Sequence, residues 1–175
     1  MIGQQSASHN MILAGGRKGI GMKKTTTGFT IIEVVLVLAI AGLIFLMVFL
    51  ALPALQRQQR DTQRRSDASR VATNLTNWKS NNNGQLPLAA NEASFVTSYL
   101  KAATEFKSPA TQATYAISWV RTAADATTAN ASTNADAAFF GIGFNCSGET
   151  LVAAAGKFGI RIPLENGGGY CVGDN

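Results

Sequence analysis

The sequence is poor in the side chains that most enzymes use for nucleophilic or metal chemistry. It has one histidine, His9, and two cysteines, Cys146 and Cys171. A Ser-His-Asp or Cys-His site needs a histidine close to its nucleophile, and two thiols without histidine are too few for zinc. Glu165, Asn166 and Asp174 are only a weak candidate calcium set, because turn chemistry explains them equally well. We therefore predict a non-enzymatic protein without a cofactor or metal.

Acidic residues are missing from residues 1–28. Four of the 15 basic side chains lie there, at Arg17, Lys18, Lys23 and Lys24, which leaves 11 basic against 10 acidic residues in the rest of the chain. A net charge of +5 usually raises nucleic acid or an anionic membrane as a partner. Here most of that charge belongs to the first segment, so the basic balance is a poor guide to partners.

Charge is also missing from the 22 residues between Val34 and Leu55. As a helix, Val34 to Leu52 would span roughly 28 Å, close to the hydrocarbon core of a bilayer at ~30 Å. A buried helix of a soluble protein would show a polar face, which this run lacks. A cleaved secretory signal would have a shorter apolar stretch followed by small residues, whereas Gln56 and Arg57 follow here. We expect a single membrane span.

The residues around the start of this run resemble the signal of type IV prepilins. A short basic leader ends in Gly28, Phe29 follows, and Glu33 is the fifth residue counted from Phe29. Gly42 falls where this family usually has a small residue, and Pro53 comes three residues later than its usual proline, so we take these two as candidate kink positions. Residues 1–28 are the predicted leader. Residues 1–21 are either a genuine long leader or upstream sequence read from the wrong Met, and we favour Met22 as the start.

The resemblance implies that a prepilin peptidase cuts after Gly28 and methylates the new amine of Phe29. The precursor would cross the cytoplasmic membrane once with its N-terminus inside. It would then polymerise with itself and other pilins on a pilus assembly platform, giving an extracellular filament for adhesion, motility or DNA uptake, with DNA a partner only through the filament. Two alternatives stay open: a type II secretion pseudopilin and an uncleaved, membrane-anchored ligand-binding protein.

Glu33 is the one acidic residue at the start of the apolar run. An ionised side chain costs about 3 kcal/mol in the bilayer interior, although Glu33 could also reach the headgroups from its place near the end. In a filament the carboxylate needs a partner, and cleavage creates an α-ammonium on Phe29. Such a pair at ~4 Å is worth about 4 kcal/mol at an effective dielectric near 20. The resemblance places that ammonium on a neighbouring subunit, so Glu33 and Phe29 are predicted assembly residues.

A long helix is expected over residues 29–80, with residues 29–55 in the membrane or the filament core. Val71, Leu75 and Trp78 continue at spacings of three and four, which predicts a stripe that packs a head domain. The five arginines between Arg57 and Arg70 have no interleaved aromatics, so we interpret them as a solvated or inter-subunit helix face.

Residues 81–175 are predicted to form this head. Strands are expected at Tyr115–Trp119, Phe139–Phe144, Phe158–Leu164 and Tyr170–Val172, with the third at an edge because of Pro163. The Ala/Thr/Asn-rich segment 122–137 offers no core-forming residue and is predicted to be a surface loop. The expected fold class is α+β: a long N-terminal helix packed on a small antiparallel sheet, as in pilins.

Cys146 and Cys171 are both in the predicted head, which lies outside the membrane if the N-terminus is cytoplasmic. A disulfide suits that oxidising compartment, and the resemblance agrees, since pilins often have a C-terminal bridge. Two buried free thiols are the alternative.

Overall fold

The computed structural model describes residues 28–174. Its contacts divide the chain into two units, one ending at Gly42 and one beginning at Leu43. A single helix, α1 (Ile31–Asn81), begins in the first unit and continues through most of its length in the second. Pro53 lies within this helix without interrupting it. The 22-residue uncharged run and the polar segment after it thus form one element.

The second unit contains a four-stranded sheet in the order β1-β2-β3-β4, formed by β1 (Ala116–Val120), β2 (Ala137–Ser147), β3 (Thr150–Pro163) and β4 (Gly169–Gly173). β2 pairs antiparallel with β3, and β3 with β4. β1 pairs parallel with β2, so the prediction of a purely antiparallel sheet is wrong. The reason is the β1–β2 connection, which carries a helix and returns the chain to the same end of the sheet.

That helix, α3 (Ala123–Ala131), occupies the segment predicted to be a surface loop. The side chain of Thr122 accepts a hydrogen bond from the backbone of Asp125, whose carboxylate accepts one from the Thr122 backbone. This capping box satisfies two backbone donors at the start of the helix. Ala126 and Ala129 are buried against the sheet. Because alanine is small, α3 can pack close to the sheet, and the segment needs no large apolar residue for this contact.

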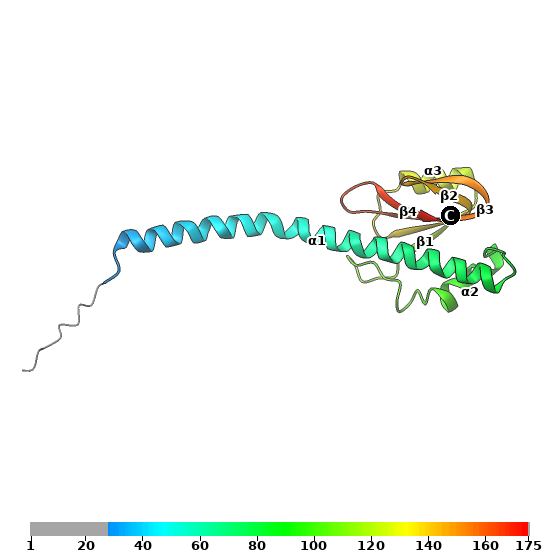
Figure 1. Ribbon diagram of the computed structural model, residues 1–175, viewed down its shortest axis with the longest axis horizontal. Helices are drawn as coiled ribbons and strands as arrows, with labels where there is room; N and C mark the ends of the chain where they lie inside the picture. Colours follow the sequence, from blue (N-terminus) through cyan, green and yellow to red (C-terminus); the bar gives the residue numbers. More distant parts are fainter. Residues whose placement is uncertain (1–27, 175) are drawn as a thin grey trace, which may run out of the picture. The chain divides into compact units, whose positions relative to one another are not determined.

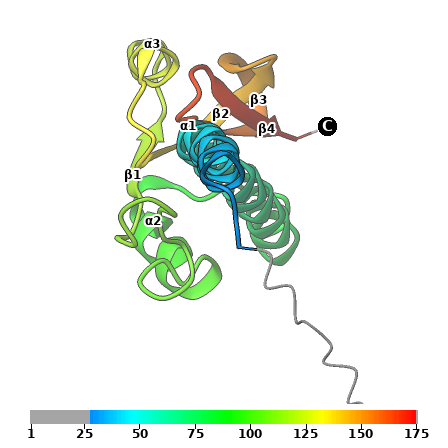
Figure 2. The ribbon, with the colours of Figure 1, turned by 90° about the vertical axis from the view of Figure 1, so that its left-hand side faces the viewer.

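The two faces of the sheet bury separate cores, and Figure 1 shows α1 along one face and α3 along the other. On the α1 side, Phe140, Ile160 and Ile162 pack against α1 and against aromatic residues from the segment between α1 and β1. That segment holds η1 (Ala89–Asn91), α2 (Glu92–Ser94) and the π-helical turn η2 (Phe95–Tyr99), which lie beside β1 in Figure 2. On the α3 side, Phe139, Phe144 and Leu151 close a smaller core. Adjacent residues of β2 thus serve opposite layers, as strand alternation requires.

Pro163 is the last residue of β3, which lies between β2 and β4, so the prediction of an edge strand is wrong. At that position the missing N–H of proline ends the strand instead of marking an unpaired edge.

Three glycines form a row across the sheet. Gly141 pairs with Gly159, and Gly159 pairs with Gly173. The outer part of the β2–β3 hairpin folds back over this row, after a register irregularity between Ile142 and Phe144. A Cβ on Gly159 would lie 2.7 Å from Leu151 Cδ2 and 3.2 Å from the backbone of Asn145. The missing side chains therefore give the folded hairpin its close approach to the sheet.

Replacing Gly159 by alanine should lower the free energy of unfolding by about 1–3 kcal/mol, because the new methyl group meets backbone as well as the Leu151 side chain. Urea unfolding of the detergent-solubilised chain, followed by tryptophan fluorescence, measures this loss. Val152→Ala, at an exposed position of the same hairpin, is the matched control and should change stability by no more than ~0.5 kcal/mol. Equal stabilities of the two variants would show that the hairpin does not depend on the glycine row.

Candidate assembly site

The residues predicted for cleavage and assembly lie at the start of α1. Gly28, Phe29 and Thr30 are not helical, and the helix begins at Ile31. Phe29 is 88% exposed, and a Cβ on Gly28 would meet no atom within 4 Å. The bond between Gly28 and Phe29 therefore lies in an open, non-helical segment directly before the helix.

Glu33 caps this helix. Its Oε2 accepts hydrogen bonds from the backbone N–H of Thr30 at 2.9 Å and from the Thr30 hydroxyl at 2.8 Å, and the Thr30 hydroxyl lies 3.4 Å from the Glu33 backbone nitrogen. This reciprocal arrangement is a capping box. The sequence analysis missed Thr30, although the spacing of Thr30 and Glu33 before an apolar run is the usual signal for such a cap. Both strong bonds use Oε2, so Oε1 still has its lone pairs for an incoming donor.

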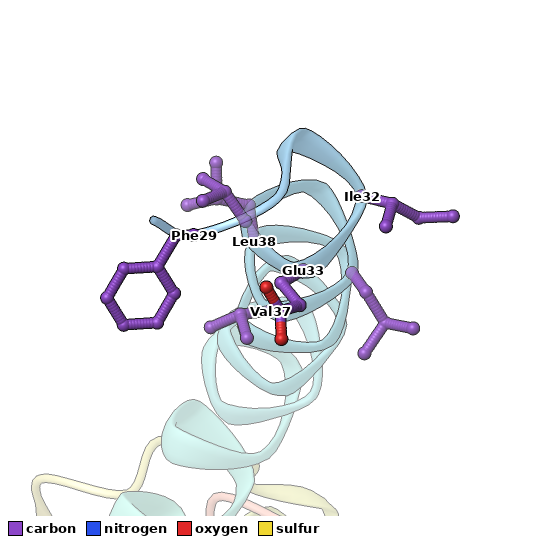
Figure 3. Close-up of a pocket in the computed structure, with 7 residues that line it drawn as sticks. Phe29, Ile32, Glu33, Val37 and Leu38 are labelled. Atoms are coloured by element: carbon purple, nitrogen blue, oxygen red, sulfur yellow. The ribbon is translucent and has the colours of Figure 1, made fainter. Parts of the chain in front are cut away.

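The surroundings of Glu33 are apolar. An open groove of about 700 Å³ is lined by Phe29, Glu33 and five aliphatic residues of the first helical turns. Figure 3 shows the Phe29 ring projecting to one side of the helix while the Glu33 carboxylate lies among the aliphatic side chains. Glu33 itself is exposed in the single chain. Once lipid or protein covers the groove, a cation at this carboxylate would be held in a largely apolar setting, where charge–charge attraction is stronger than in water.

The helix that follows is long and apolar enough to cross a membrane. Its large hydrophobic side chains from Ile31 to Leu55 are between 44% and 85% exposed, on all sides of the helix. Such a surface does not stay in water and needs lipid or other protein as cover. Gly42 and Pro53, the candidate kink positions, both lie within the uninterrupted helix.

Farther along α1, the predicted head-packing residues are part of the larger core. Val71 and Leu75 are fully buried, and Trp78 is nearly so. The Trp78 ring lies edge-on to Phe95 and Tyr99, with centroids 5.9 and 5.1 Å away. These contacts hold the turns after α1 against its last residues.

A cluster of charges that the sequence analysis did not find joins α1 to the turn after β3. Glu165 binds Arg60 through contacts at 2.6 and 2.8 Å, and it also lies 2.7 Å from the Nη1 atom of Arg64. Asp61 contacts the same Nη1 atom and accepts the backbone N–H groups of Glu165 and Asn166 at 2.8 and 3.1 Å. The two arginines hold the pKa of Glu165 down to about 2.

Arg64 is fully buried, and its Nε atom donates to the backbone carbonyl of Ala135 at 2.9 Å. The interpretation of the arginines as a uniformly solvated or inter-subunit face is therefore wrong at this position. Nothing in the sequence distinguishes Arg64 from the other arginines of this segment, except that it lies on the same side of the helix as Val71, Leu75 and Trp78.

A second buried polar pair lies one turn farther along. The Tyr115 hydroxyl donates to Asp67 Oδ2 at 3.1 Å. Burial, reinforced by the Asp67 charge, raises the pKa of Tyr115, and burial also raises the pKa of Asp67. The pair fixes the segment before β1 to α1.

The weak calcium candidates do not come together. Glu165 is taken by arginines, the backbone of Asn166 binds Asp61, and Asp174 forms an ion pair with Lys79 at 2.6 Å. Within residues 28–174 no group of three acidic, histidine or cysteine side chains is arranged to hold a metal ion.

Cys146 and Cys171 form a disulfide. It joins the folded-back part of β2 to β4, beside the smaller core on the α3 side. The disulfide thus holds the folded-back end of the β2–β3 hairpin against β4, in the close position that the glycine row permits.

Comparison of the chain with protein-family models, with curated proteins and with solved structures found no match. The resemblance carried by Gly28, Phe29 and Glu33 accordingly remains a prediction from the sequence.

Glu165 should make the attachment of the head sensitive to acid. Because its pKa is about 2 in the folded chain against an ordinary 4.5, its stabilisation is present above pH 4.5 and is lost as the pH falls toward 2. Allowing for the partial exposure of the pair, we expect Glu165→Gln to cost about 1–3 kcal/mol at pH 7. The difference from the natural chain should vanish near pH 2, as measured by urea unfolding at several pH values. A deficit that stays constant down to pH 2 would contradict the ion-pair explanation.

Proposed function

We propose that this chain is a type IV pilin-like subunit of a surface filament. It is made as a single-span membrane precursor, cut between Gly28 and Phe29, methylated on Phe29, and polymerised through the first half of α1. The observation that carries the proposal is the combination at the start of α1: an open Gly28–Phe29 bond, a lone carboxylate four residues later, and a helix with apolar residues exposed on every side.

The lone carboxylate gives the proposed assembly its specificity. After cleavage, Phe29 carries an ammonium that needs an anion once the helix leaves the lipid headgroups. Glu33 is the one acidic residue between Phe29 and Leu55, and its Oε1 still has lone pairs to accept that ammonium from a neighbouring copy. Apolar contacts alone would let helices slide past each other, whereas one charge pair in an apolar setting fixes their axial offset.

The proposed location follows from the same arrangement. The basic leader would stay in the cytoplasm, where a prepilin peptidase of the membrane removes it, and the head would lie on the outer side. The Cys146–Cys171 disulfide supports an oxidising compartment for the head. The further partners of the proposal are an assembly platform and other pilin-like subunits.

Blocking the cut should leave the leader in place. Gly28→Arg puts a long, charged side chain beside the bond that the peptidase must hold, so we expect the precursor mass to persist in membranes and filaments to be absent. Intact mass and N-terminal sequencing measure this directly, with Thr27→Ser as a mild neighbouring control. A normal mature mass from Gly28→Arg, or a natural chain that never begins at Phe29, would favour the uncleaved membrane-anchored protein.

The charge of Glu33 can be separated from its capping role. Glu33→Gln keeps a side chain that can cap the helix but removes the charge, whereas Thr30→Ala weakens the cap and keeps the charge. We expect Glu33→Gln and Glu33→Val to insert into the membrane normally and to lower the yield of sheared filaments at least ~10-fold, in line with a pair worth a few kcal/mol. Thr30→Ala should lose less. Full filament yield from Glu33→Gln would refute the charge pair.

A further inference from the structure

The sheet of the head has two open edges, with β1 at one side and β4 at the other (Figure 2). β1 runs parallel to β2, and β2, β3 and β4 alternate in direction, so β1 and β4 point the same way. Each of the two strands is five residues long. The two edges therefore match each other in direction and in length.

The outer edge of β4 has unpaired backbone groups. The Asp174 N–H donates to the Phe158 carbonyl at 3.0 Å, and this bond sets the hydrogen-bonding pattern of the β3–β4 ladder. Only every second residue of an antiparallel strand bonds to the same neighbouring strand, so Val172 bonds to β3, whereas Cys171 and Gly173 point away from it. Within residues 28–174 no other group binds the outward N–H and C=O of these two residues.

The outer edge of β1 has the complementary set. The Ala116 N–H donates to the Asp136 carbonyl at 2.8 Å, at the start of the parallel β1–β2 ladder. The bonds of such a ladder recur at every second residue, so Ser118 also bonds to β2, whereas Ile117 and Trp119 direct their N–H and C=O groups outward. In the part of the chain that the structure describes, these outward groups have no hydrogen-bond partner either.

Neither edge has the features that usually prevent pairing with another chain. Natural edge strands often carry a lysine, a proline or a bulge for this purpose. β1 reads AISWV and β4 reads GYCVG, and both pair with their neighbours in unbroken register. Arg121 and Asp174, which directly follow the two strands, are each held in an ion pair. Only the first residue of β4 is closed, because Gly169 is buried and its N–H donates to Glu149 at 3.1 Å.

We propose that β4 of one copy pairs in parallel with β1 of a second copy, so that two heads share one continuous sheet. Ser118 of the second copy then lies beside Cys171. The Cys171 N–H donates to the Ile117 carbonyl of the second copy, and the Cys171 carbonyl accepts the Trp119 N–H. The Gly173 N–H donates to the Trp119 carbonyl. A second copy is the favoured occupant because its β1 supplies donors and acceptors at the spacing at which β4 leaves its own groups unpaired.

The twist of the sheet determines which copies can meet in this way. Neighbouring strands are rotated by about 20–25°, so the steps from β1 to β1 of the next copy turn the second head by roughly 80–100°. The head-bearing parts of α1 in two paired copies then cross instead of lying parallel. The contact itself goes beyond the proposed function, and only its place rests on that function: it joins chains of different filaments, not neighbours within one filament.

The pairing can be tested with the full chain in detergent, at concentrations up to about 1 mM, where a contact of a few hydrogen bonds is populated. A photo-reactive benzoylphenylalanine replaces the exposed Ser118, and the exposed Thr128 of α3 is the matched control position. After irradiation we expect position 118 to give an adduct of twice the chain mass, attached to residues 169–174 of the second copy or to residues 145–150, which the disulfide holds beside them. Position 128 should give at least ~5-fold less, since α3 offers no strand edge. Tryptophan fluorescence checks that the head is folded, and Ala116, also exposed on β1, is the second probe position if the change at 118 unfolds it.

An adduct on any other part of the second copy would overturn the pairing, as would no adduct or equal amounts from the strand and control positions. This readout needs neither cleavage nor filaments, so it decides the contact even if the proposed function fails. Where filaments form, those of the photo-reactive chain are mixed with filaments of the same chain labelled with heavy nitrogen and then irradiated. Adducts that join a light to a heavy chain support a contact between filaments, whereas adducts of light chains alone would overturn that placement.

Discussion

The structure of the head-bearing unit depends on the buried guanidinium of Arg64. It is held by Asp61, Glu165 and the Ala135 carbonyl, which come from α1, from the turn after β3 and from the segment before β2. A buried ion pair adds little net stability over apolar packing, but breaking one side of it costs about 3–5 kcal/mol. The cluster therefore determines the position of the sheet along α1, and it contributes less to the strength of the contact between the sheet and α1. A sliding apolar contact through Val71 and Leu75 alone would not define that position.

Because the head has a fixed position on α1, the two parts of this uninterrupted helix have surfaces of different chemistry. The side chains up to Leu55 are apolar and exposed, so they need lipid or protein cover. From Asp61 onward one side is buried by the head, and its charges are neutralised there. Arg60, which pairs with Glu165, comes five positions after Leu55, about 8 Å along the helix. The first ion pair between α1 and the head thus lies close to the end of the apolar stretch.

Elements with a strong periodic signal could be predicted from the sequence, and elements that depend on small residues could not. The uncharged run and the Val71–Trp78 spacing indicated α1. Alternation indicated β1, and the other three strands were expected, although β2 and β3 extend well beyond the predicted Phe139–Phe144 and Phe158–Leu164. α3 was missed because Ala126 and Ala129 contribute little hydrophobicity, although Thr122 and Asp125 have capping-box spacing. The parallel β1–β2 pair was missed with it. The glycine row has no signal in one dimension, since Gly141, Gly159 and Gly173 become neighbours only once the register is known. At the candidate site, Gly28, Phe29 and Glu33 could be chosen from sequence, but the charges around Arg64 required the fold.

The two small-residue features serve the same physical purpose in different layers. On the sheet, the glycine row lets the β2–β3 hairpin approach closely enough for Leu151 to fill the smaller core and for Cys146 to reach Cys171. On α1, Ser69, Thr73 and Thr76 have short side chains that donate to the helix backbone. The exposed side of the helix therefore has few polar groups without a hydrogen-bond partner. Close approach gains dispersion contacts only when no polar group or charge is left unpaired beneath it. The sheet meets that condition by the pairing of its strands, and the exposed hydroxyls of α1 meet it by their bonds to the helix backbone.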